Sequence, residues 1–125
     1  MKEILFVGVG GFIGAALRYI ISNYTAKAFG NQFPYGTLIV NVAGCLLIGF
    51  ILEIYISSNY ISDTMKLFLT TGILGGLTTF STFSSETIVY FTAGNYISAF
   101  LNTALNLFLG FGAVIFGRFL ATKMV

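Results

Sequence analysis

Four long apolar stretches constrain the fold of this chain more than any other feature. They cover about residues 4–25, 35–57, 64–92 and 95–122, and short polar segments separate them. Each is long enough to cross a bilayer, which takes about 20 residues of helix. Continuous apolar runs without polar and apolar alternation exclude a transmembrane β-barrel in practice. The sequence therefore predicts an all-α membrane protein in which residues 1–125 form a single four-helix transmembrane domain.

The composition excludes several functional classes. Charged residues make up only 8% of the 125 residues, whereas a soluble domain carries about 25%. A net charge of +2 without a basic run is too small for a nucleic-acid interface. Without His, and with Cys45 alone, the chain can form neither a structural zinc site nor an intrachain disulfide. We therefore expect no enzyme, and a lipid membrane rather than nucleic acid as the surroundings.

Small residues in the first stretch indicate close helix packing. Gly10 and Gly14 have the four-residue spacing that lets helix backbones approach within a membrane. No cleavage site follows a short apolar core, so we expect a retained helix rather than a secretory signal. Pro34 directly precedes the second stretch, where its missing N–H costs nothing.

The distribution of basic residues predicts orientation only weakly. Four Lys and Arg residues fall on one expected side of the membrane and two on the other. Basic loops favour the cytoplasmic side, but this difference is small. Both a fixed orientation and insertion in both orientations stay open on charge alone.

The third stretch contains the most unusual local sequence. Two adjacent glycines, Gly75 and Gly76, precede two β-branched residues, Thr78 and Thr79, in the middle of a crossing. These residue types are poor helix formers, which predicts a break between Gly75 and Thr79. Backbone groups freed by a break need buried protein partners, a watery cavity or an ion. The alternative is an unbroken helix whose glycines only permit tight packing.

Beyond the expected break, the sequence predicts an aromatic and a polar stripe. Phe80 and Phe83 share one helix face, and Thr79, Thr82 and Glu86 form a polar line beside them. A carboxylate inside a crossing is costly and is a functional candidate. The two Phe residues can equally be ordinary packing, because the chain contains 14 of them.

Polar residues also recur at four-residue spacing in two other stretches. Thr37 and Asn41 lie in the second, and Ser98, Asn102 and Asn106 lie in the fourth. Each residue can act as interhelical hydrogen-bonding glue. Together they can line a narrow uncharged path with amide and hydroxyl donors, which suits a small anion or water.

Three motifs carry a resemblance to a known family. The segments GGFIGAALRY (residues 10–19), GTLIVNVAG (36–44) and GILGGLTTFSTF (72–83) resemble the signatures of the CrcB/Fluc family of fluoride channels. The resemblance implies a multi-pass protein of the bacterial cell inner membrane that forms an antiparallel, dual-topology homodimer. Such a dimer would hold two pores that passively export toxic cytoplasmic fluoride.

The resemblance also implies roles for particular residues. A structural sodium ion at the dimer interface would bind backbone carbonyls of Gly75 and Thr78 from both subunits, and Arg18 would lie near the vestibule. Ring edges of Phe80 and Phe83 would face fluoride, because the edge of an aromatic ring carries the positive end of its quadrupole. The remaining expected pore residues are Asn41, Ser81, Thr82 and Glu86 from the resemblance, and Thr37, Asn102 and Asn106 from the polar pattern.

One departure from the family concerns the fourth stretch. The family often has a tyrosine and serines at the positions where this chain has Asn102, Asn106 and Gly110. Amides can replace hydroxyls as donors, so both Asn residues are candidates for this pore wall.

Two other functions are compatible with the composition. A small dual-topology exporter coupled to protons would use Glu86 to load and release them. A membrane subunit without transport activity would need none of the polar residues for conduction.

Overall fold

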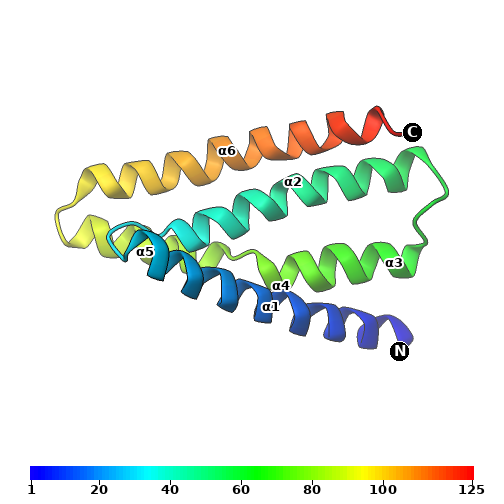
Figure 1. Cartoon of the computed structure of the whole chain (residues 1–125), viewed down its shortest axis with the longest axis horizontal. Helices are drawn as coiled ribbons and strands as arrows, with labels where there is room; N and C mark the ends of the chain where they lie inside the picture. Colours follow the sequence, from blue (N-terminus) through cyan, green and yellow to red (C-terminus); the bar gives the residue numbers. More distant parts are fainter.

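The computed structural model describes all 125 residues as helices joined by short turns (Figure 1). The first, second and last long helices are α1 (Lys2–Phe29), α2 (Tyr35–Ser57) and α6 (Tyr96–Thr122). The third crossing is divided into successive segments, which are α3 (Asp63–Leu67), the π-helical η1 (Phe68–Leu74), α4 (Gly75–Leu77) and α5 (Phe80–Thr92).

The four predicted crossings are confirmed, and their boundaries follow local signals. Four helical spans are long and apolar enough to cross a membrane. α2 has the predicted bounds, whereas α1 continues past residue 25 to Phe29. It stops before Gly30, whose φ of 77° lies in the left-handed region that favours glycine. Gly94, also at φ 77°, forms the tight turn between α5 and α6.

The second helix is the centre of the bundle. α2 contacts every other helical segment, and its most extensive interface is with α6. α1 packs on the third crossing, chiefly on η1 and α4, and does not contact α6. Both termini lie at the same end of the molecule, as an even number of crossings requires (Figure 1).

Glycines bring the backbones of α1 and the third crossing into contact, as the spacing of Gly10 and Gly14 predicts. Both residues are buried. A Cβ atom at Gly10 would lie 2.7 Å from the Phe68 carbonyl oxygen, and one at Gly14 would overlap the Ile73 carbonyl. Because these neighbours are backbone atoms, they cannot move aside as a flexible side chain can.

The predicted break is confirmed and lies at the two threonines rather than at the glycines. Thr78 and Thr79 adopt extended backbone angles, with ψ values of 159° and 117°. Their β-branched side chains suit extended backbone. Gly76 stays helical, and its missing side chain lets α4 approach Gly11 of α1. The π-helical turn before the break has no counterpart in the sequence-based prediction.

A methyl group at Gly14 should destabilise the protein. We expect Gly14→Ala to lower the free energy of unfolding by about 1–3 kcal/mol, the usual cost of overpacking. Gly8→Ala is the matched control, because a Cβ there has no atom within 4 Å. Thermal unfolding in one detergent compares the two variants. Equal melting temperatures would contradict the close contact between α1 and the third crossing.

Candidate functional site

The broken third crossing is held by one carboxamide. Asn41 accepts a hydrogen bond from the Thr79 backbone N–H at 2.8 Å and donates through Nδ2 to the Thr79 carbonyl at 3.1 Å. In a continuous helix that N–H would donate to the carbonyl of Gly75. Asn41 therefore replaces the helical hydrogen-bond partners of Thr79. The Gly75 carbonyl is left without its helical donor.

An arginine from the first helix supplies a second contact with the break. Arg18 donates through Nη1 to the Thr78 carbonyl at 3.1 Å. The helical partner of that carbonyl would be the Thr82 N–H, which instead donates to the Thr79 hydroxyl at 3.2 Å. The guanidinium of Arg18, expected near the vestibule, thus lies at the break itself.

Three hydroxyl groups gather at the start of α5. The Thr79 side chain caps this helix and also donates to the Thr82 hydroxyl at 3.0 Å. The Ser81 hydroxyl lies 3.4 Å from that of Thr79. A helix N-terminus carries partial positive charge, so this cluster of hydroxyls lies in a potential that favours an anion.

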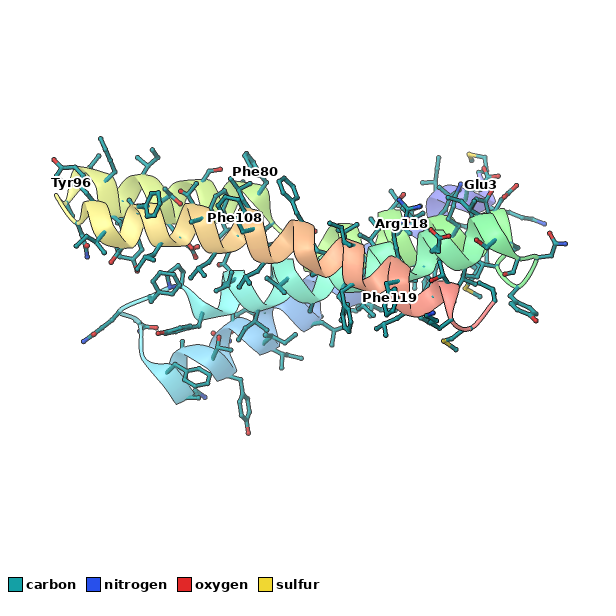
Figure 2. All side chains as sticks on the ribbon, turned by 90° about the horizontal axis from the view of Figure 1, so that it is seen from above. Glu3, Phe80, Tyr96, Phe108, Arg118 and Phe119 are labelled. Carbon is teal, nitrogen blue, oxygen red and sulfur yellow. The ribbon has the colours of Figure 1, made fainter.

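A central hollow of about 300 Å³ brings together half of the predicted site residues. The expected sodium residues and the expected aromatic pair line this one hollow, together with two amides: Gly75, Thr78, Phe80, Phe83, Asn41 and Asn106. The centroids of the two Phe rings are 5.6 Å apart. Phe83 is buried, whereas Phe80 is 77% exposed and projects outward near the middle of the molecule (Figure 2).

A second hollow of about 480 Å³ lies between α1, α2 and α5. Thr37, Thr82 and Glu86 all line it. Thr37 donates to Oε1 of Glu86 at 2.7 Å, while the buried Oε2 has no hydrogen-bond partner. We call this hollow the vestibule, and it contains a carboxylate whose second oxygen is buried without a hydrogen-bond partner.

The fourth-helix amides form hydrogen bonds within the protein. Asn106 accepts from Asn41 at 2.9 Å and donates to the carbonyl of Asn102 at 2.9 Å. Asn102 is completely buried and donates to the Thr87 hydroxyl at 3.0 Å. Asn102, Arg18 and Ser81 line neither hollow.

Two contacts between helices are not predicted by the sequence: that of Asn102 with Thr87 and that of Asn41 with Thr79. Thr87 lies four residues after Phe83, a spacing that predicts the observed 2.9 Å bond from its hydroxyl to the Phe83 carbonyl. Its contact with Asn102 depends on how α5 packs on α6, which no local pattern reveals. The pairing of Asn41 with the break likewise joins residues 38 positions apart.

Backbone carbonyls at the break offer oxygen ligands for a cation. No group of three or more His, Cys, Asp or Glu side chains is placed to hold a metal ion. The carbonyl oxygens of Gly75 and Thr78 have lost their helical partners, and hard cations such as Na⁺ favour oxygen ligands. Since Thr78 already accepts from Arg18, its second lone pair is the one available.

Four membrane crossings with polar groups converging on a broken helix define the architectural class. Discontinuous helices that expose backbone groups to a cavity are a recurrent feature of membrane transport proteins. The sequence profile described as "CrcB-like protein, Camphor Resistance (CrcB)" matches residues 5–118. The chain belongs to this family, and it is a multi-pass protein of the cell inner membrane.

Curated relatives support the same assignment. A protein of Clostridium perfringens named "Fluoride-specific ion channel FluC" is 59% identical over 117 residues, which cover 94% of this chain and 91% of the relative. A protein of Clostridium novyi with the same name is 57% identical over 114 residues, covering 91% and 89%. One from Dehalococcoides mccartyi, also of that name, is 46% identical over 124 residues, covering 99% and 95%.

Removal of the Asn41 carboxamide should destabilise the break. Asn41→Leu leaves the N–H and the carbonyl of Thr79 without partners, and an unpaired buried group costs about 1–3 kcal/mol. We expect a lower unfolding midpoint in detergent than for Ile39→Leu, a control on the half-exposed face of the same helix. If Asn41→Leu is as stable as this control, Asn41 does not hold the break.

Proposed function

We propose that this protein is a passive fluoride-selective channel that exports toxic cytoplasmic fluoride. The observation that carries the proposal is the start of α5, where hydroxyls, a positive helix end and two aromatic rings meet between two hollows. Hydroxyl and ring-edge donors stabilise an anion without binding it as tightly as a fixed cation does. The names of the curated relatives support the same ion.

The proposed pathway connects the two hollows along α5. Phe80 and Phe83 flank the ion in the central hollow, where Asn41 and Asn106 also line the wall. The hydroxyls of Ser81 and Thr82 lead from the rings toward the vestibule, where Thr37 and Glu86 lie. Asn102 contributes from behind this wall, because it is completely buried.

The pore is proposed to form between two copies of the chain. Only 16 of 125 residues are buried in one protomer, and Phe80 and Gly75 both lie on its exposed surface. A second copy packed on this face would enclose the central hollow. The weak charge bias permits insertion in both orientations, so we propose an antiparallel, dual-topology homodimer with two pores.

The dimer centre is the proposed place of a structural sodium ion. Carbonyls of Gly75 and Thr78 from both subunits would hold it, and its positive charge would offset the negative ends of those groups. The space beside Gly75 is open in one protomer, because a Cβ atom placed there would have only the Thr70 carbonyl oxygen within 4 Å, at 3.7 Å.

One observation favours proton-coupled export as a second candidate. The Oε2 atom of Glu86 is buried without a partner in the vestibule, so this carboxylate could carry a proton. A proton-coupled exporter would move its substrate in response to an imposed pH gradient. A passive channel would respond only to the fluoride gradient and the membrane voltage.

Fluoride efflux from liposomes tests the proposed function. Purified protein is reconstituted into vesicles loaded with equal fluoride and chloride, and ion-selective electrodes follow both anions after dilution. We expect rapid release of fluoride, little release of chloride, and no dependence on an imposed pH gradient. Protein that releases neither anion would support a subunit without transport activity, and release driven by pH would support the exporter.

Loss of the ring edges should slow fluoride permeation. Ring edges carry the positive end of the aromatic quadrupole, so Phe80→Ile and Phe83→Ile should each lower fluoride efflux, and a tenfold loss would correspond to about 1.4 kcal/mol. Size-exclusion chromatography should show the same assembly as the unchanged protein. Exposed Phe108 of α6 provides the control Phe108→Ile. Wild-type efflux from both α5 variants would remove the rings from the pathway.

A branched side chain at Gly75 should disrupt assembly rather than the protomer. Within one protomer a Cβ at this position makes only an ordinary contact, whereas it would crowd the proposed dimer centre. We expect Gly75→Val to shift the protein from dimer to monomer in sodium-containing detergent, as measured by light scattering. Gly8→Val, at an open position on α1, is the control. A dimeric, conducting Gly75→Val protein would contradict both the interface and the sodium site.

A further inference from the structure

A continuous chain of hydrogen bonds runs through three helices and returns to the helix where it begins. It starts at the backbone of Thr79, passes through the carboxamides of Asn41, Asn106 and Asn102, and reaches the Thr87 hydroxyl. Thr87 then donates to the Phe83 carbonyl at 2.9 Å. Both ends of the chain are therefore on the first turns of α5, the segment that carries the aromatic pair.

Backbone groups at the two ends fix the orientation of every amide between them. The Thr79 N–H can only donate, so it faces Oδ1 of Asn41 and turns Nδ2 toward Asn106. Asn106 then presents Oδ1 to Asn41 and donates to the Asn102 carbonyl, which can only accept. At the far end Thr87 donates to a carbonyl and so accepts from Asn102.

This hydrogen-bond network leaves no spare hydrogen on Nδ2 of Asn41. Nδ2 of Asn41 carries two hydrogens, and these face two acceptors, the Thr79 carbonyl and Oδ1 of Asn106. Nδ2 of Asn106 likewise faces the carbonyl and Oδ1 of Asn102, at 2.9 and 3.1 Å. Asn102 and Thr87 line neither hollow, so no ion in those hollows can touch them.

We propose that Thr87, Asn102 and Asn106 are positioning residues that act through Asn41. They lock its carboxamide onto Thr79 and thereby fix the first turn of α5, on which Phe80 and Phe83 approach the ion. Fully paired polar networks stiffen the groups they connect, because each lost bond leaves a buried polar group unsatisfied. The selectivity consequence rests on the proposed fluoride pathway, whereas the locking of Asn41 does not.

Amide hydrogen exchange measures the locking directly. The full chain, ¹⁵N-labelled at asparagine, is studied by NMR in lipid nanodiscs, with the exposed residues Asn23, Asn31 and Asn59 as references. We expect the side-chain NH₂ of Asn41 to exchange at least about tenfold more slowly than the references. This rate should not change when fluoride replaces chloride. Exchange as fast as the references, or a rate set by fluoride, would overturn the proposal.

Substitutions at Thr87, the far end of the hydrogen-bond network, test whether the network holds the Asn41 carboxamide in place. Thr87→Val removes the hydroxyl at nearly constant volume, and Thr87→Ser restores it. Thr103→Val is the matched control, since its hydroxyl bonds only to the Ala99 carbonyl of its own helix. Of these three variants, we expect only Thr87→Val to raise the exchange rate of the Asn41 side-chain NH₂ by about tenfold or more and to lower the fluoride-to-chloride efflux ratio.

The two readouts separate this proposal from the proposed function. If the unchanged protein releases no fluoride, the channel proposal fails and the exchange rates still decide whether Asn41 is locked. If Thr87→Val behaves like Thr103→Val in exchange, the chain of hydrogen bonds does not hold Asn41. Faster exchange in Thr87→Val with an unchanged efflux ratio would overturn the positioning role.

Discussion

The pairing of Asn41 with the Thr79 peptide is the interaction on which the rest of the structure depends. A helix cannot open inside a membrane unless its freed N–H and carbonyl groups find other partners. One carboxamide supplies both a donor and an acceptor, and Arg18 supplies a further donor to Thr78. The third crossing can therefore change direction without unpaired groups at Thr79, and a new helix begins in mid-membrane with hydroxyls at its positive end.

In the proposed fluoride pathway, that new helix start takes the place of charged side chains. The chain has four acidic and six basic residues, and most of them lie near the ends of the helices. In the low-dielectric interior a full charge beside the ion would hold it strongly, whereas hydroxyls, ring edges and a helix end hold it weakly. The arrangement at Thr82, Phe80 and Phe83 suits entry and release of a small anion.

The sequence predicts this fold well, because its main signals are local. Apolar length places the four crossings, the Gly10 and Gly14 spacing identifies a close interface, and the β-branched pair after Gly76 indicates the break. The sequence predicts the site less completely. The partnerships of Asn41 with Thr79 and of Asn102 with Thr87 depend on helix packing, and the π-helical turn before Gly75 has no distinctive composition. The pattern predicts Asn102 as a pore-wall residue, and in the structure it is completely buried and lines neither hollow.

The reversal potential in a planar bilayer tests the central claim most directly. With chloride and pH equal on both sides and a tenfold fluoride gradient, a fluoride-selective channel reverses near the Nernst value of about 59 mV for a monovalent ion. The account predicts that value, with the sign that fluoride dictates. A reversal potential near zero under these conditions, or one that follows an imposed pH gradient instead, would contradict it.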